Sequence, residues 1–378
     1  MERAWDISCD ANSNIYIVGD YADSLCVNGV TYPGLGLSDS YVLKYNSSGQ
    51  LLWAKTFGST NEDVALGVGC DAAGNCYVGG YYIDTFNCQG QSVQSYGMWD
   101  AYLLKLDPQG SLLWLRSFGG PMNDIGHGLA VNDAGNVYVA GWFADTIKFS
   151  GGDTIVSAGG SDIYCSAWDT EGNFLWARRA GMSGVEYGYK VACDNNGAAY
   201  VTGVAGSGSQ FGAFTLDSDG VFVVKYNALG QEEWLASTHT PFVISISVQP
   251  NQNGQQFGMI SGRVIGSGSI GQFNYTSIAE SEDAYWAQFD ALSGTWTFLG
   301  VYGGALSDKG RDCDYEDYPV FVSSFEGNAN FGGNLFASSG ESDLMLGFNN
   351  PVAPQWIATG GLTRLYHFKY VRACSAIT

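Results

Sequence analysis

The chain has 378 residues, and 46% of them are apolar, which is enough to build a large hydrophobic core. A net charge of −21 makes the surface repel nucleic acid and anionic lipid, so neither is expected as a partner. No apolar run approaches the roughly 18 residues of a membrane-spanning helix, so membrane insertion is not expected. With 53 glycines, only 8 prolines and 14% aromatic residues, the composition is typical of many short strands joined by tight turns.

Nearly the same phrase recurs along the chain about every sixty residues. It reads "DANSNIYIVGDY" from Asp10, "DAAGNCYVGGYY" from Asp71, "DAGNVYVAGWF" from Asp133 and "DNNGAAYVTGV" from Asp194. Six tryptophans mark the period, and six aromatic residues after the opening turn mark it again. The two sets are Trp53, Trp114, Trp176, Trp234, Trp296 and Trp356, and Tyr16, Tyr77, Tyr138, Tyr200, Phe257 and Phe321. Both markers predict six copies of one structural unit.

The third copy shows the internal order of a unit. An alternating strand is expected over 127–133, a turn at "AGN", and a second strand over 137–143. A third region begins at 147–149 and passes through a glycine-rich loop. Further strands are expected over 163–169 and 173–180. No segment holds a helical apolar period for three turns, so the chain is predicted to be all-β.

Four strands per unit, repeated six times, predict a β-propeller of four-stranded antiparallel blades. Sheets stacked around an axis cover each other's faces, and the recurring tryptophans would fill the space between them. One propeller domain is expected over 1–360, followed by a partial repeat or C-terminal tail at 361–378. The repeats run approximately over 1–60, 61–121, 122–183, 184–240, 241–303 and 304–360. Seven blades remain an alternative if the partial repeat counts.

The motif D-x-x-G-N-x-Y-V-x-G-[YF], followed by a strand ending in K-[YL]-[ND]-x-x-G-x-x-x-W, resembles the bacterial SBBP β-propeller repeat. Two copies carry it closely: Asp71 to Tyr81 with Asp100, Tyr102, Lys105, Asp107, Gly110 and Trp114, and Asp10 to Tyr21 with Asp39, Tyr41, Lys44, Asn46, Gly49 and Trp53. The resemblance is strong over residues 1–236 and weakens over 237–360. It implies a propeller in an exported or cell-surface bacterial protein, often as one module of a larger chain. It does not imply a chemistry.

The N-terminus, "MERAWDISCD", has no basic and apolar leader and begins inside a repeat. The chain could therefore be intracellular, could have lost a signal peptide, or could be a fragment of a longer protein. The resemblance favours an extracellular or cell-surface location.

Two sets of acidic residues recur. Asp39, Asp100, Asp162, Asp219, Asp283 and Asp343 precede a strand in all six units, which indicates a structural role in turns. Asp63, Asp124, Glu186 and Asp308 lie where a repeat begins, so they are expected in loops around one mouth of the central channel. A ring of carboxylates there could hold Ca²⁺ or a cationic ligand, although solvated loop acids or turn caps are the alternative. No D-x-D-x-D-G calcium loop is present.

Aromatic residues are the second set of candidate ligand contacts. Trp99 lies in a loop, and Trp142 follows a strand glycine. In the adjacent pairs Tyr81–Tyr82 and Trp142–Phe143, one ring is expected in the core and the other at the surface. An exposed ring could serve as a platform for a sugar or a peptide.

The sequence does not indicate catalysis. The three histidines, His127, His239 and His367, occupy unequal repeat positions and have no partner in a recognisable nucleophile motif. No CxxC pair is present among nine cysteines, although Cys70 and Cys76 could face each other across two strands as a disulfide. We therefore expect a non-enzymatic binding or structural module that presents loops to a protein or glycan partner. The alternative is a polysaccharide hydrolase or lyase that uses acids near the channel mouth.

Overall fold

The structure is a computed structural model that describes residues 1–239, 242–249, 254–315, 319–331, 334–338, 343–348 and 355–359, with backbone alone for 315, 347–348 and 355–359. The described residues form strands and turns, with a single 3₁₀ turn at Ile278–Glu280. The predicted partial repeat at 361–378, His367 and the side chain of Trp356 lie outside them.

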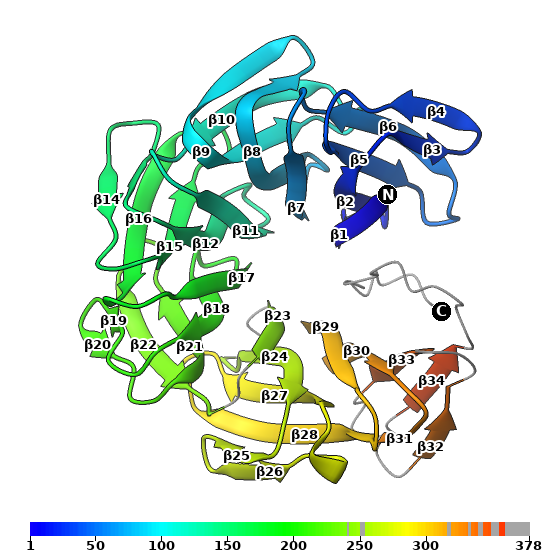
Figure 1. Cartoon of the computed structure of the whole chain (residues 1–378), viewed down its shortest axis with the longest axis vertical. Coiled ribbons are helices and arrows are strands. Elements are labelled where there is room, and N and C mark those ends of the chain that lie inside the picture. Colours follow the sequence, from blue (N-terminus) through cyan, green and yellow to red (C-terminus); the bar gives the residue numbers. More distant parts are fainter. Residues whose placement is uncertain are drawn as a thin grey trace.

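Six four-stranded antiparallel sheets stand around a common axis as the blades of a propeller (Figure 1). Blade 1 contains β1 (Glu2–Cys9), β2 (Ile15–Tyr21), β5 (Asp39–Tyr45) and β6 (Leu51–Phe57); blade 2 contains β7 (Asp63–Cys70), β8 (Cys76–Cys88), β9 (Gln91–Leu106) and β10 (Leu112–Phe118); blade 3 contains β11 (Asp124–Val131), β12 (Val137–Phe143), β15 (Asp162–Trp168) and β16 (Phe174–Gly181). Blade 4 contains β17 (Tyr187–Cys193), β18 (Ala199–Ala205), β21 (Gly220–Tyr226) and β22 (Glu232–Ser237); blade 5 contains β23 (Phe242–Val248), β24 (Phe257–Val264), β27 (Asp283–Asp290) and β28 (Trp296–Gly304); blade 6 contains β29 (Lys309–Tyr315), β30 (Pro319–Phe325), β33 (Asp343–Phe348) and β34 (Gln355–Thr359). The predicted six-bladed, all-β propeller is confirmed.

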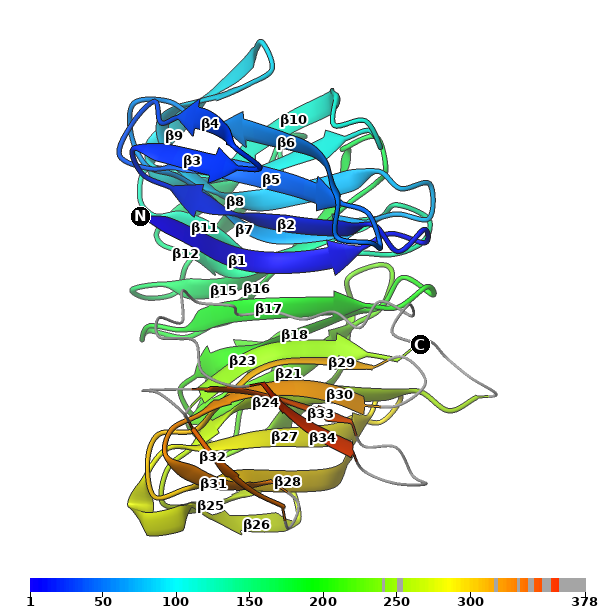
Figure 2. The same ribbon diagram turned by 90° about the vertical axis from the view of Figure 1, so that its right-hand side faces the viewer.

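The inner strands β1, β7, β11, β17, β23 and β29 surround the axis in chain order (Figure 1). The strands run along this axis (Figure 2). We call the end where the inner strands begin the strand-start face, and the opposite end the strand-end face. Blades 1 and 4 lie on opposite sides of the axis, so residues far apart in the sequence can meet there (Figure 1).

A short hairpin lies between the second and third strands of each blade, and in blades 2 to 6 it pairs with the preceding blade. These hairpins are β3 (Ser24–Val27) with β4 (Val30–Pro33), β13 (Thr146–Lys148) with β14 (Thr154–Val156), β19 (Gln210–Phe211) with β20 (Phe214–Thr215), β25 (Ser267–Ile270) with β26 (Phe273–Thr276), and β31 (Asn328–Phe331) with β32 (Asn334–Ala337). In blade 2 the hairpin is an extension of β8 and β9. The hairpins of blades 4 and 6 pair with β16 and β28, the outer strands of blades 3 and 5. Backbone pairing therefore reinforces the packing between blades.

Tryptophans of the outer strands join each of the first four blades to the next. Trp114 is buried, and its Nε1 donates to the Thr170 carbonyl in the turn before the outer strand of blade 3, at 3.1 Å. The indole lies against Gly172 of the same turn. The equivalent bonds run from Trp53 to Pro108, Trp176 to Ala228 and Trp234 to Ala291. The predicted role of these rings, packing between neighbouring sheets, is confirmed.

The fifth tryptophan of the predicted period does not occupy the repeat position. Strand pairing places Phe298 opposite Gln288, the register that Trp53 and Trp114 occupy opposite Lys44 and Lys105. Trp296 pairs two residues earlier, opposite Phe289, and packs with the cluster between blades 4 and 5. The prediction that Trp296 marks the period was therefore wrong. The turn before the outer strand of blade 5 closes from the Asp290 N–H to the Thr295 carbonyl, one residue longer than the Asn46–Gln50 turn of blade 1, and Phe298 takes the repeat position.

Candidate functional site

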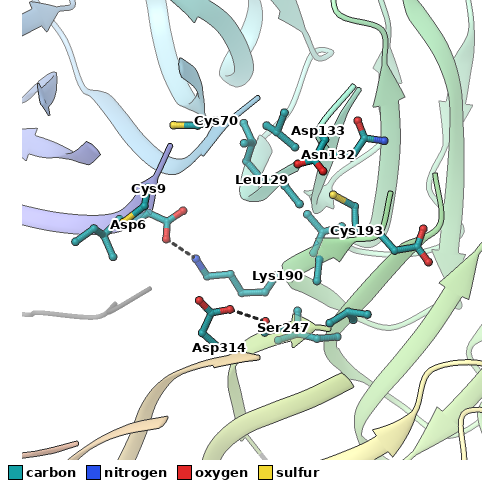
Figure 3. Close-up of a pocket in the computed structure, with 18 of the residues that line it drawn as sticks. Asp6, Cys9, Cys70, Leu129, Asn132, Asp133, Lys190, Cys193, Ser247 and Asp314 are labelled. Atoms are coloured by element: carbon teal, nitrogen blue, oxygen red, sulfur yellow. Dashed lines mark hydrogen bonds and ion pairs between the residues drawn. The ribbon is translucent and has the colours of Figure 1, made fainter. Parts of the chain in front are cut away.

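A cavity of about 550 Å³ opens on the axis at the strand-end face and is lined by the ends of all six inner strands. We call it the axial pocket. Seven aspartates and one lysine are among its lining residues (Figure 3). The acidic side chains belong to Asp6, Asp10, Asp71, Asp133, Asp194, Asp312 and Asp314. The pocket is therefore strongly negative.

Lys190 spans the pocket from blade 4 to blade 1. It lies on β17, is 7% exposed, and its Nζ is 3.7 Å from Asp6 Oδ1 (Figure 3). The other Asp6 oxygen accepts the backbone N–H of Val68 at 2.9 Å. Because opposite blades meet only at the axis, this ion pair joins two distant parts of the ring.

Two aspartates of blade 6, Asp312 and Asp314 on β29, form another wall of the axial pocket. Ser245 donates a hydrogen bond to Asp312, and Ser247 donates one to Asp314 at 2.8 Å (Figure 3). Burial raises the pKa of Asp312 to about 7, while the hydrogen bond from Ser245 opposes the rise. Asp312 is therefore partly protonated near neutral pH, and its neighbourhood combines a carboxyl group, hydroxyls and an ammonium group.

The rim aspartates that the repeat supplies hold the turns after the inner strands. Asp71 Oδ1 accepts the N–H groups of Ala73 and Asn75, at 3.0 and 2.9 Å. Its other oxygen accepts the Tyr77 hydroxyl at 3.0 Å and lies 3.6 Å from Lys105 Nζ. Asp10 and Asp194 serve the equivalent turns. These carboxylates contribute charge to the pocket, but their hydrogen bonds are used locally.

The predicted ring of Asp63, Asp124, Glu186 and Asp308 lies near the other end of the axis, at the start of inner strands. All four residues are at most 1% exposed, so they do not form an open ring of ligands. Each accepts a backbone N–H of the preceding loop: from Ser59, Gly120, Met182 and Gly304 respectively. They act as turn caps at four separate blade junctions, which was the alternative interpretation.

Burial changes the ionisation of these capping acids. It raises the pKa of Asp63 and of Asp308 to about 7. The pKa of Asp124 rises to about 9 because of burial and the neighbouring charge of Asp100. The pKa of Glu186 is also raised, by burial first and by Asp162 in addition.

The predicted aromatic contacts lie at the strand-start face. Trp99 packs against Tyr81, with ring centroids 5.3 Å apart, and Trp142 packs edge-on against Tyr187 at 5.5 Å. Both tryptophans are half-buried. Tyr82 and Phe143, the chain neighbours of Tyr81 and Trp142 in the predicted pairs, are fully buried. The structure thus separates Trp99 and Trp142 from the axial pocket.

The remaining candidates form no catalytic or metal-binding cluster in the part of the chain that the structure describes. His127 Nδ1 donates to the Tyr189 carbonyl at 3.1 Å, and His239 Nδ1 lies 3.2 Å from the Ser269 hydroxyl. Cys70 and Cys76 are cross-strand neighbours with free thiols. No group of three histidine, cysteine or acidic side chains is arranged to hold a metal among the described residues.

The residues that define the axial pocket were missed from the sequence. Lys190, Asp6 and Asp312 occupy one equivalent position of the inner strands, where the other copies have the small residues Gly67, Gly128 and Ser245. Their signal is a charged residue at a repeat position that is otherwise small. A repeat pattern is defined by what its copies share, so it does not show these departures.

The fold and its axial pocket define the chain as a β-propeller module. No known family profile matches it. Over 171 residues it is 29% identical to the regulatory protein FlaEY of Caulobacter vibrioides, covering 43% of this chain and 18% of that protein. Over 197 residues it is 23% identical to an uncharacterized WD repeat-containing protein of Acanthamoeba polyphaga mimivirus, covering 44% of this chain and 14% of that one. The matches thus span less than a fifth of either relative.

Among solved structures, the chain is similar to the quinohemoprotein alcohol dehydrogenase of Comamonas testosteroni, with a TM-score of 0.39 and 11% identity over 95% of this chain and 62% of that one. It is also similar to a rhamnogalacturonan lyase of Bacillus licheniformis, with a TM-score of 0.25 and 10% identity over 80% of this chain and 52% of that one. At these TM-scores the similarity says nothing about activity. In the part of the chain that the structure describes, no helix has the length and apolarity to cross a membrane.

Proposed function

We propose that this propeller is a non-catalytic binding module whose axial pocket receives a basic side chain of a protein partner. The observation that carries the proposal is the lining of the pocket, with seven aspartates and one lysine around about 550 Å³. That volume is sufficient for a lysine or arginine side chain. An acidic, partly enclosed site attracts cationic groups and raises their rate of association.

The Lys190 side chain already occupies the axial pocket, and a cationic ligand would either displace its ammonium group or bind beside it. It lies between Asp6 and the Asp312 wall, so the pocket already holds one ammonium group in the position where a ligand cation would be stabilised. Asp314 and Asp133 lie toward the rim (Figure 3). A second cation would meet these carboxylates first.

The test is calorimetric titration of the full chain with acetyl-lysine-amide, acetyl-arginine-amide and a short basic peptide at low salt, with neutral oligosaccharides as the competing class. We expect the basic peptide to bind, Asp314→Asn to weaken binding by roughly tenfold, and added salt to weaken it further. Asp153→Asn, at an exposed outer hairpin, is the matched control and should leave binding unchanged. Binding of oligosaccharides alone would move the site to a glycan ligand, and no binding by either class would favour a structural spacer.

The acid-dependent alternative, a polysaccharide hydrolase or lyase, has one observation in its favour. Asp312 is buried in the pocket wall with a pKa of about 7, a value that suits a general acid. Release of reducing or unsaturated ends from acidic and neutral polysaccharides, lost in Asp312→Asn, would replace the binding proposal with this one.

We also propose, from the resemblance to SBBP repeats, that the module belongs to an exported or cell-surface bacterial protein. Digestion of intact cells by a protease, followed by detection of the propeller with an antibody, tests this location. Protection in intact cells and digestion only after lysis would contradict it.

A further inference from the structure

Buried carboxylates meet in pairs where one blade passes to the next. One member lies on the third strand of a blade, at its first residue except for Asp100 within β9, and the other lies at the start of the next inner strand. The pairs are Asp39 with Asp63, Asp100 with Asp124, Asp162 with Glu186, and Asp283 with Asp308. All eight residues are at most 1% exposed. The two acidic sets seen in the sequence are thus partners.

The space between paired carboxylates is narrow and contains a glycine. A side chain at Gly58 would meet both Asp39 Oδ1 and Asp63 Oδ2, and one at Gly303 would meet both Asp283 Oδ1 and Asp308 Oδ2. The two carboxylates of a pair therefore face the same point of the chain.

One oxygen of most of these groups has no hydrogen-bond donor. The second oxygen of each is used by the loop: Asp124 Oδ2, for example, accepts the Gly120 N–H at 2.7 Å. The buried oxygens without a hydrogen-bond partner are Oδ1 of Asp39, Asp63, Asp100, Asp124, Asp162 and Asp283. In the pair Asp283–Asp308, the Oδ1 of Asp308 accepts the Glu326 N–H at 3.1 Å, so only Asp283 has such an oxygen there. Ionising both carboxyl groups of a buried pair is costly unless a positive charge lies beside them.

One junction supplies that positive charge itself. At the pair Asp162–Glu186, the guanidinium of Arg179 lies 2.6 Å from Asp162 Oδ2. Arg179 is two residues before the junction glycine, Gly181. At the three other junctions the equivalent residues, two before Gly58, Gly119 and Gly303, are Thr56, Ser117 and Val301. None of these side chains is charged.

We propose that the pairs Asp39–Asp63, Asp100–Asp124 and Asp283–Asp308 each bind one Ca²⁺ ion, which takes the place that the Arg179 guanidinium has beside Asp162. Carboxylate oxygens are the ligands of a hard cation, and Ca²⁺ tolerates an irregular shell completed by backbone carbonyls and water. The ions would join neighbouring blades and have no part in the axial pocket. They would stabilise the propeller rather than hold a partner.

The experiment is titration of the chelator-treated full chain with CaCl₂ at pH 8, followed by calorimetry and by the melting temperature, with MgCl₂ in a parallel arm. We expect about three Ca²⁺ ions per chain, a rise of several degrees in melting temperature, and weaker binding of Mg²⁺. Asp124→Asn should remove one equivalent, whereas Asp314→Asn, in the axial pocket, should leave the count unchanged. Failure of this proposal is thus separable from failure of the basic-partner proposal.

Two variants exchange the internal and external cations. Ser117→Arg places a guanidinium at the junction of blades 2 and 3 and should remove one Ca²⁺ equivalent, while Ser117→Ala should not. Arg179→Met removes the internal cation and should add a fourth equivalent. No bound Ca²⁺ and no change in melting temperature would overturn the proposal, as the pairs would then each retain a proton. Ca²⁺ binding that is unchanged in Asp124→Asn and Ser117→Arg would also overturn it.

Discussion

The four junctions that join blades 1 to 5 are packed differently from the junction between blades 5 and 6, although the repeat length is similar throughout. In those four, a tryptophan on an outer strand bonds to a turn of the next blade, as Trp114 does with Thr170. In the junction between blades 5 and 6, Trp286 stacks on Phe298 at 4.3 Å and on Phe321 at 5.6 Å across the interface. A propeller therefore needs a large aromatic surface between its sheets more than it needs one particular contact.

The tryptophan junction is a composite of several contacts. Trp114 packs against Tyr77, with centroids 5.9 Å apart, and Lys105 lies 4.8 Å over the same tyrosine ring. Lys105 Nζ also reaches the Thr170 carbonyl at 3.1 Å. The aromatic stack between blades 5 and 6 has an apolar surround of Met259 and Cys313 instead. The tryptophan junctions thus fix the position of one blade against the next through hydrogen bonds, whereas the junction between blades 5 and 6 depends on the packing of apolar side chains.

The largest expected effect comes from removing the tryptophan of a composite junction. Trp114→Ala should lower the free energy of unfolding by about 3–5 kcal/mol, because it leaves a cavity between blades 2 and 3 and removes a donor from the Thr170 carbonyl. Urea unfolding measures this loss. Trp99→Ala, at the half-buried strand-start face, is the control and should cost about 1 kcal/mol or less. Equal losses in the two variants would show that the junction is no more important than the surface.

The fold was predictable because its packing is periodic. A tryptophan and a tyrosine that recur about every sixty residues must fill equivalent spaces, and that predicts stacked sheets. The identity of the packing residue in blade 5 was not predictable. Trp296 keeps the spacing in the chain, but the register of β28 gives the interface position to Phe298. The spacing between tryptophans does not reveal that the turn before β28 is one residue longer than in blade 1.

The candidate pocket was less predictable, since it arises from departures between copies. Lys190 and Asp6 come from blades on opposite sides of the ring, and their meeting depends on the number of blades and on the closure of the ring. The acids predicted from the sequence as ligands, Asp63, Asp124, Glu186 and Asp308, recur in several copies, and each caps a turn at a blade junction. Acidic residues that recur in several copies have a structural role, whereas the charged residues that differ between copies line the axial pocket.

The next largest effect is a pH dependence that distinguishes the inner strand of blade 6 from those of blades 2 and 3, which have Gly67 and Gly128 at the position equivalent to Asp312. Burial raises the pKa of Asp312 to about 7, so between pH 4 and 7 the folded state holds a proton that the unfolded chain has lost. The contribution of Asp312 to the free energy of unfolding is most favourable below about pH 4, declines as pH rises from about 4 to 7, and is constant above that range. Its slope is at most about 1.4 kcal/mol per pH unit.

Thermal or urea unfolding between pH 4 and 8 measures this slope, with chelator present throughout so that divalent cations do not contribute. Asp312→Asn should reduce the decline, because the amide does not titrate and can still accept the hydrogen bond from Ser245. The groups that face Asp312 are Lys190, Asp6 and Asp314. Asp153→Asn keeps these groups and should retain the wild-type slope. Identical slopes in wild type and Asp312→Asn would show that Asp312 is ionised throughout this range.

The smallest effect compares one glycine at a tryptophan junction with the equivalent glycine of the turn in blade 1. Gly172 and Gly49 lie at the same turn position of blades 3 and 1, with φ of +75° and +77°. A Cβ at Gly172 would lie 2.9 Å from the Trp114 ring, whereas one at Gly49 would meet nothing within 4 Å. Gly49→Ala should therefore cost about 1 kcal/mol from backbone strain alone, and Gly172→Ala about 1 kcal/mol more because the indole must move. The difference between the two, measured by urea unfolding, isolates the contact of a tryptophan with the next blade. In a Trp114→Phe background, where the ring is smaller, the difference should shrink; if it stays the same, the extra cost belongs to the turn and not to the junction.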